Sequence, residues 1–349
     1  MDTSADVEAA TAYHRLDGGD DEGHGIDIVS LGSNSESDEE GVFLLQSVSD
    51  EISEGQGTDL GGGEDDYVLV PQSRITHRNL LNLLAYLSSL FVHYAIGIWG
   101  LNGLIPTIRE VTDAHRTLLT PADWTHWIWA LIYSVEAIFI LAQLTPKYRS
   151  VRVVLQGAGY FFVYSCMAQI AWTVLYTLGK FLPAFVMMLT NLVAMCFVIM
   201  SQFLAQSRGE SRTEYFLLRF PFSLHVGWVF VETATNFSMW SQSFGVSQGW
   251  QVCAAIVSLG ILLMVASLFL GARTAKGLVV PSVIIWAFVG IGLALRHPAP
   301  SIIDMYEDSV ISGVRRASLS FAVIVSSVLA SRLGFHVAEE CFTIRIVEH

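Results

Sequence analysis

The sequence predicts an all-α polytopic membrane protein with about eight transmembrane helices, preceded by an acidic tail. Of its 349 residues, 52% are hydrophobic and only 15% are charged, which is typical of membrane proteins. The apolar residues gather in stretches of about 20, the length that crosses a bilayer as a helix. Because backbone polar groups inside a bilayer need internal partners, we expect these stretches to be helical.

The first 72 residues differ from the rest in charge. They contain 19 acidic residues and one basic residue, whereas the remainder contains 13 acidic and 18 basic residues. The segment has few aromatic residues and no hydrophobic period, so we expect it to be a disordered, cytosolic tail.

Within this tail, Glu40 is followed by Leu44 and Leu45, as in an acidic dileucine sorting signal. The stretch 67–70 resembles a tyrosine-based sorting signal. These patterns predict a sorting adaptor as partner and an endosomal, lysosomal or vacuolar membrane as location. The alternative is that the tail is only a solvated spacer.

Charged separators divide the remaining chain, and their distribution predicts its orientation. Twelve basic residues fall on the side of the two termini and six on the other side, which places both termini in the cytosol. We expect a domain over 73–243, three further helices over 244–335 and a short tail over 336–349. The predicted spans are 80–100, 122–144, 151–176, 181–205, 217–240, 250–271, 278–295 and 314–333.

The second span contains polar residues on one face. Thr120, Pro121 and Asp123 are typical of a helix start, with Thr120 as the N-cap and Asp123 as the acid of a capping box. We interpret Trp124 and Trp127 as anchors at the membrane surface. A helical projection places four side chains on a stripe about 80° wide. Since a carboxylate inside a span costs at least about 2.5 to 3.5 kcal/mol, this stripe should face the interior of the bundle. Its members are His126, Trp129, Tyr133 and Glu136.

The fifth span repeats the pattern with His225, Trp228, Glu232 and Asn236 on one face. The first span offers Tyr86 and His93, seven residues apart, and the third offers a similar band with Gln169, Trp172 and Tyr176. Small residues such as Gly157, Gly159, Gly227 and Gly260 should allow neighbouring helices to approach closely.

Several function classes have no support in the sequence. We find no phosphate-binding glycine loop, no activated nucleophile and no metal-ligand pair, and basic residues are too scattered for nucleic acid. The four cysteines have no paired spacing. We therefore expect no enzyme activity, no required cofactor, no metal and no nucleic-acid partner.

These motifs resemble the translocator protein family, also called tryptophan-rich sensory proteins, and in particular its longer, multi-span branch. PADWTHWIWALIY is similar to the second helix of that branch, with Pro121, Trp129 and Tyr133 at the family spacing. RFPFSLHVGW, followed by Asn236 and Trp240, is similar to its fifth helix. The resemblance covers about residues 80–243.

The resemblance implies a five-helix bundle whose pocket is covered by the loop between helices one and two. Family ligands are flat hydrophobic molecules such as tetrapyrroles and sterols, and family members are often dimers. The residues that would line or support the pocket are Trp129, Tyr133, Trp172, Trp228, Asn236 and Trp240. Glu136 and Glu232 are additions to the family pattern, and as inward-facing groups they join the candidate binding residues.

Four hypotheses therefore stay open. The first is binding, sensing or movement of a small hydrophobic or flat aromatic ligand. The second is a proton-coupled transporter that uses Glu136 and Glu232, with His93, His126 and His225 as a proton relay. The third is a membrane enzyme, and in the fourth the glutamates only hold helices together by hydrogen bonds.

Overall fold

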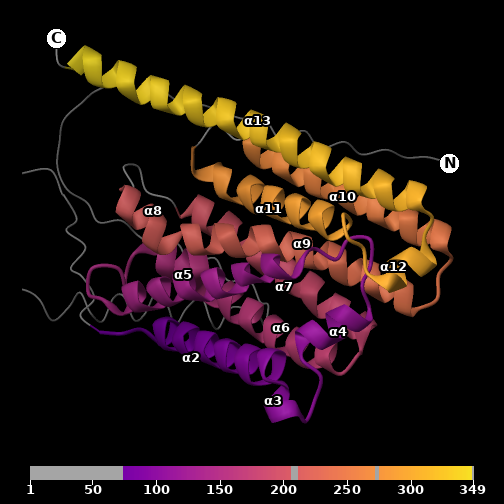
Figure 1. Ribbon diagram of the computed structural model, residues 1–349. Helices are drawn as coiled ribbons and strands as arrows, with labels where there is room; N and C mark the ends of the chain where they lie inside the picture. The colour runs from indigo at the N-terminus through magenta and orange to yellow at the C-terminus, as the bar shows by residue number, and fades with distance from the viewer. Residues whose placement is uncertain (1–73, 206–210, 272–274, 348–349) are drawn as a thin grey trace, which may run out of the picture. The chain divides into compact units, whose positions relative to one another are not determined.

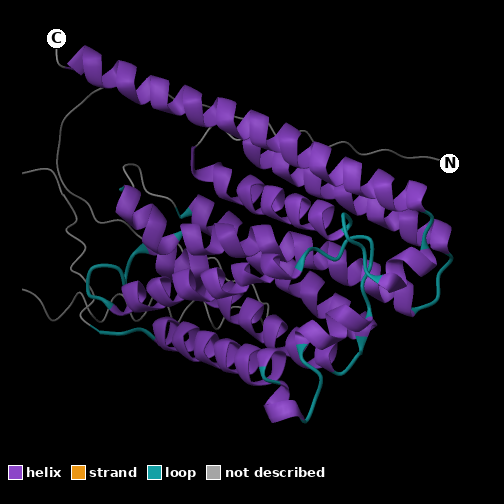
Figure 2. Cartoon of the chain, in the orientation of Figure 1, coloured by secondary structure: helices purple, strands orange, loops and turns teal. Residues whose placement is uncertain are grey.

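The computed structural model describes residues 74–205, 211–271 and 275–347, except the side chains of 275, 276 and 336–347. The predicted tail over 1–72, with the sorting residues Glu40, Leu44 and Leu45, lies outside the described residues. Every regular element in the described ranges is a helix, as Figure 2 shows.

Helices occur at all eight predicted positions, and six of them are long and apolar enough to cross a membrane. In the order of the chain, these six candidate spans are His77–Gly103, Asp123–Leu144, Val153–Thr177, Phe181–Leu204, Gln248–Gly271 and Asp308–Phe335. The predicted span over 278–295 is a shorter apolar helix, α11 (Val279–Ala294).

The predicted span over 217–240 forms α9 (Phe220–Ser243), which is long enough to cross but is not among the six apolar helices. Its neighbours explain its polarity. It contacts α5 (Trp127–Leu144), α7 (Phe181–Leu204), α10 (Gln248–Gly271) and α11, so it lies inside the bundle (Figure 1).

The other main helices surround this centre. The helix α6 (Gly159–Thr177) contacts α7 and also α2 (His77–Val92), while α13 (Asp308–Val347) contacts α10 and α11. One buried apolar cluster extends from Tyr86 in α2 to Val325 in α13. The last three helices therefore share a core with the first five, and the predicted division into two parts at 243 stays a prediction.

Short elements occupy both ends of the bundle. One end, hereafter the loop end, carries α3 (Gly100–Gly103), α4 (Ile108–Ala114) and α12 (Pro300–Met305), and α8 (Arg212–Leu218) lies at the other end (Figure 1). Two π-helical segments, η1 (His93–Ile98) and η3 (Val153–Ala158), adjoin α2 and α6, and the 3₁₀ segments η2 (Asp123–His126) and η4 (Ala275–Leu278) precede α5 and α11.

The start of the second span differs from the prediction. Thr120 is not a helix cap, because its hydroxyl accepts from the backbone N–H of Thr117 at 2.8 Å and the helix begins later, with Ala122 in the capping position. The side chain of Asp123 does not cap the helix either and is paired with Arg109 and Arg116. Trp127 is more exposed than Trp124. The ring of Trp124 packs edge-to-face on that of Trp286, with 4.5 Å between the ring centroids.

The glycine prediction is correct at two positions. A Cβ atom at Gly157 would lie 2.8 Å from Gln202 Cγ, and one at Gly227 would lie 3.0 Å from Val283 Cβ. Both glycines therefore allow a close helix contact. The expectation for Gly260 is wrong, since nothing lies within 4 Å of a Cβ atom added there. A Cβ atom added at Gly159 likewise has no neighbour within 4 Å, but this glycine adopts a φ of +46°.

Candidate functional site

The two predicted polar stripes face each other inside the bundle. On α5, the side chains of Trp129, Tyr133 and Glu136 are buried, and Glu136 is only 2% exposed. The helical projection predicted this orientation correctly, because the opposite face of α5 carries exposed apolar residues such as Leu131 and Leu141.

The stripe on α9 is equally well covered. His225, Trp228, Glu232 and Asn236 are all buried, and the Trp228 side chain is completely inaccessible. The fifth predicted residue on this helix behaves differently. Trp240 stacks on Phe185 of α7 at 5.7 Å with nearly parallel rings, and it is the one α9 candidate that the structure does not place with the others.

Two histidine–glutamate contacts join α9 to α5 and to His126, which directly precedes α5. The Nδ1 atom of His225 lies 2.7 Å from Oε1 of Glu136, and Nε2 of His126 lies 4.0 Å from Oε1 of Glu232. Because α5 and α9 run in opposite directions, the histidine of each helix meets the glutamate of the other. We call these four side chains the crossed pairs.

Trp129 lies at the centre of an aromatic cluster. Its ring centroid is 5.5 Å from that of His93, 6.0 Å from Tyr133, 6.4 Å from Trp172 and 5.8 Å from His225. The contact with Trp172 is stacked, with 27° between the planes, and the contact with His225 is edge-to-face. The cluster therefore joins side chains from η1, α5, α6 and α9.

Asn236 fixes the indole of Trp172. The Nε1–H group of Trp172 donates to Oδ1 of Asn236 at 2.8 Å, and the amide of Asn236 donates to the backbone carbonyl of Glu232 at the same distance. Since Trp172 stacks on Trp129, Asn236 holds the aromatic cluster in place without touching Trp129.

The N-terminal side of the cluster is shaped by a π-helix. Regular α-helix ends at Val92, and η1 places His93 at the start of a wider turn, with a side chain that is only 3% exposed. Single π-helical turns are frequent at functional sites, because they shift the side chains on one face of a helix. No sequence signal that we used indicates this turn.

A cavity of about 570 Å³ lies beside the cluster, toward the loop end. Of the predicted site residues it is lined by His93, His126 and Trp129, which form its inner part. The other lining residues were not predicted as site residues from the sequence. They are apolar and hydroxyl-bearing residues in the wall and charged residues at the rim. These are Tyr94, Gly97, Ile98, Thr107, Ile108, Arg109, Thr112, Asp113, Asp123, Trp127 and Ala130.

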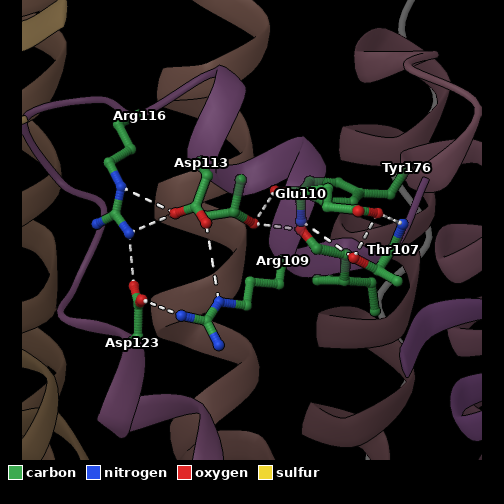
Figure 3. Close-up of polar contacts among 9 residues, drawn as sticks. Thr107, Arg109, Glu110, Asp113, Arg116, Asp123 and Tyr176 are labelled. Atoms are coloured by element: carbon green, nitrogen blue, oxygen red, sulfur yellow. Dashed lines mark hydrogen bonds and ion pairs between the residues drawn. The ribbon is translucent and has the colours of Figure 1, made fainter. Parts of the chain in front are cut away.

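The rim is held by a network of ion pairs, shown in Figure 3. Arg116 donates from Nη2 to Asp113 and to Asp123 at 2.5 Å each, and Arg109 lies 3.3 Å from Asp123 and 3.8 Å from Asp113. Burial opposes the charge of Arg116 and lowers its pKa. The hydrogen bonds to Asp123 and Asp113 act in the other direction, and the resulting pKa lies above its ordinary value.

The loop also makes two polar contacts that fix α4. Thr107 and Glu110 form a capping box, and the hydrogen bonds that the Glu110 carboxylate accepts from Thr107 hold the pKa of this carboxyl below its ordinary value. The hydroxyl groups of Thr112 and Tyr176 lie 2.8 Å apart and join α4 to α6 (Figure 3). The single charged residues in 101–120 gave no sign that they form one network.

The described residues contain no group of three His, Cys, Asp or Glu side chains that could hold a metal ion. Apart from the crossed pairs and His93, the polar groups near the cluster are amides and hydroxyls. The Ser165 hydroxyl donates to Oδ1 of Asn191, whose amide donates to Gln169 at 2.7 Å. Asn191 is a site neighbour that the sequence analysis did not single out.

Comparison with known proteins supports the resemblance and extends it. A family model described as "TSPO-like protein" matches residues 79–325, beyond the region around 80–243 whose motifs suggested the family. No curated protein and no solved structure matches the chain significantly. Because the match covers well over half of the chain, including all or part of each of the eight helices, the protein belongs to the TSPO-like protein family.

Proposed function

We propose that this multi-span membrane protein binds a small, flat, hydrophobic ligand in the cavity between η1, α4 and α5. The observation that carries the proposal is the cavity of about 570 Å³, within the range of about 300 to 1,000 Å³ for small-molecule sites. Its inner wall is the face of Trp129, and Tyr94 and Trp127 contribute further aromatic surface. Rigid aromatic walls suit a flat ligand, because they offer contact area with few rotamers to order.

The family supports the same class of ligand. Members of the TSPO-like family are typically non-enzymatic membrane receptors or sensors. We propose a tetrapyrrole or a sterol as the ligand class, with Trp129 as the contact and Tyr133, Trp172, Trp228 and Asn236 as the support behind it. Glu136 and Glu232 would belong to the same site and would lie behind the aromatic side chains that form the cavity wall.

The proposal can be tested by titrating the purified chain in nanodiscs with protoporphyrin IX. We expect saturable quenching of tryptophan fluorescence, weakened by Trp129→Phe and by Gly97→Leu, whose Cβ would already lie 2.7 Å from Cδ1 of Ile108 and would displace this lining residue. Trp250→Phe is the matched control, since Trp250 is 69% exposed and lies on α10, away from the cavity. Quenching that is unsaturable, or equal in all variants, would show that the cavity does not bind this ligand class.

The crossed pairs favour a second candidate function, a proton-coupled transporter that uses Glu136 and Glu232. In this mechanism one glutamate would alternate between its ionised and protonated forms as a substrate crosses. Uptake of protoporphyrin IX into liposomes, driven by a pH gradient and lost in Glu136→Gln, would support transport. Saturable binding without uptake would support a receptor.

The membrane arrangement completes the proposal. We propose eight crossings, with α9 and α11 crossing inside the bundle, and both termini in the cytosol, so that the cavity opens on the opposite side. Cysteine accessibility on the two sides of sealed vesicles tests this orientation. A homodimer, and an endosomal, lysosomal or vacuolar location set by an adaptor at Glu40, Leu44 and Leu45, belong to the same proposal.

A further inference from the structure

The crossed pairs are titratable groups, three of them buried, that ligand binding in the cavity does not explain. Glu136 and His225 are 2% and 4% exposed, and Glu232 is 7% exposed. An isolated ionised carboxylate at such depth is strongly disfavoured, unless a proton or a positive partner neutralises it. Each of these two glutamates has one histidine as its partner.

The inner pair, Glu136 and His225, already holds a proton. Its O···N distance of 2.7 Å is that of a hydrogen bond, which requires a hydrogen atom between the two electronegative atoms. The other ring nitrogen of His225, Nε2, is buried and has no hydrogen-bond partner within the described part of the chain. The bond to Glu136 therefore occupies one ring nitrogen of His225 and leaves Nε2 as a second atom at which a proton can bind.

The outer pair, His126 and Glu232, is reached from the cavity. The imidazole of His126 lines the cavity and is 30% exposed, whereas the Glu232 side chain behind it is 9% exposed. When hydronium in the cavity gives its proton to the neutral imidazole, an O–H bond breaks, an N–H bond forms and a water molecule is left, and the new positive charge lies 4.0 Å from the Glu232 carboxylate. Uptake of this proton replaces a lone buried charge by an ion pair.

The surroundings contain few competing groups. Tyr86, Tyr133 and Cys166 are near Glu136, and Tyr176 is near Glu232. His126 faces His93 and, at the rim of the cavity, Asp113, Arg116 and Asp123. Among the described neighbours of the two glutamates, the histidines are thus the only residue type whose unperturbed pKa lies near neutral pH.

A plug of three phenylalanines closes the opposite side. Phe139, Phe162 and Phe222 are completely buried, and their ring centroids are 4.7 to 6.0 Å apart in edge-to-face contacts. Phe139 follows Glu136 by three residues and Phe222 precedes His225 by three, so the plug lies just beyond the inner pair, toward α8. The three rings, packed edge to face, carry no polar group that a proton could occupy.

We propose that the crossed pairs form a proton-binding site that is open toward the loop end and closed toward the α8 end by the Phe139–Phe162–Phe222 plug. The outer pair exchanges its proton with water in the cavity, and the inner pair stores one behind Trp129. This inference rests on the pairs and the plug, and not on the ligand proposed for the cavity.

Infrared difference spectroscopy of the full chain in nanodiscs tests the site directly. Between acidic and alkaline buffer we expect a carboxyl C=O band that shifts in D₂O and is lost in Glu232→Gln. Glu136→Gln should remove any second component, and Glu307→Gln is the control, since Glu307 is exposed at the loop end. A band that persists in both interior variants, or is absent from the parent chain, would overturn the proposal. Such a result would leave the ligand proposal standing, because the quenching of tryptophan fluorescence by protoporphyrin IX does not depend on the proton-binding site.

Liposomes that contain a pH-sensitive dye test the plug. The parent chain should show no proton flux without ligand, and Phe222→Ala should raise flux above that of the parent, with Phe139→Ala as a second variant. Adding Glu136→Gln to Phe222→Ala should abolish the flux. Phe161→Ala is the matched control, because Phe161 stacks on Phe197 of α7 at 4.9 Å, away from the plug. Flux through the parent chain, or tight vesicles with both folded plug variants, would contradict a closed end.

Discussion

Removing the amide of Asn236 should loosen the aromatic cluster from behind. In Asn236→Ala the indole N–H of Trp172 loses its acceptor, and the carbonyl of Glu232 loses a donor. The Trp172 side chain is only 1% exposed, so no solvent replaces the lost acceptor. A buried donor left without a partner costs about 1 to 3 kcal/mol, and we expect the free energy of unfolding to fall by this amount.

The bond itself can be isolated with a double-mutant cycle. Trp172→Phe removes the donor and keeps most of the ring, so the cycle with Asn236→Ala measures the coupling between the two side chains. Hydrogen bonds between membrane helices average about 0.6 kcal/mol and reach about 1.7 kcal/mol, and this buried bond of 2.8 Å should lie toward the upper end.

The free energies are obtained by unfolding the chain in mixed micelles that contain an increasing mole fraction of a denaturing detergent. Circular dichroism monitors the loss of helix. Thr190→Ala is a suitable control, since Thr190 is exposed on α7 and its hydroxyl bonds only within its own helix. If the two single effects add to within about 0.3 kcal/mol, the side chains are not coupled and our account of the cluster is wrong.

Three further changes test other parts of the structure. Gly157→Ala should destabilise the chain by about 1 to 3 kcal/mol, because its Cβ would press on Gln202, whereas Gly260→Ala meets open space and should be nearly neutral in the same unfolding assay. Arg116→Met should increase limited proteolysis within 104–122 more than Arg109→Met does. The side chain of Arg116 is 20% exposed and makes contacts of 2.5 Å, whereas that of Arg109 is 76% exposed and makes longer ones. Equal cleavage of the two variants would refute this ranking. The Glu110 carboxylate has a pKa below its ordinary value of 4.5, so its capping contribution is complete above pH 4.5 and is lost as the pH falls through the lowered value. The protection of α4 amides against hydrogen exchange, corrected for the intrinsic exchange rate at each pH, should therefore fall in acid, and Thr107→Val, which lacks the capping hydroxyl, should show a smaller fall.

The sequence indicated the helices and their inward faces well. Periodicity at 100° per residue placed Trp129, Tyr133 and Glu136 correctly inside, because the cost of a carboxylate in lipid leaves few alternatives. It also placed His225 and Glu232 on a buried face. Which histidine meets which glutamate depends on the antiparallel packing of α5 against α9, and no single-helix projection contains this information.

The loop end was harder to foresee. The cavity rim contains Arg109, Asp113 and Asp123, and Arg116 pairs with both aspartates without lining the cavity itself. These contacts depend on how 104–122 folds back over the bundle. The start of the second span was wrong for the same reason, since Thr120 and Asp123 found partners within this loop and not at a helix end. The π-helical turn at His93 likewise follows from tertiary packing and not from local residue preference.

The polarity of α9 has a consequence for how the chain enters the membrane. A segment with His225, Glu232 and Asn236 that fails the hydropathy expected of a span partitions poorly into lipid on its own. Its neighbours on the N-terminal side, α5 and α7, are inserted first during synthesis, whereas α10 and α11 follow it. We therefore expect α9 to stay at the translocation machinery until α10 and α11 have been made, and a chain that ends at residue 243 to leave this helix outside the bilayer. The last three helices would then serve as the neighbours that allow this polar helix to be inserted.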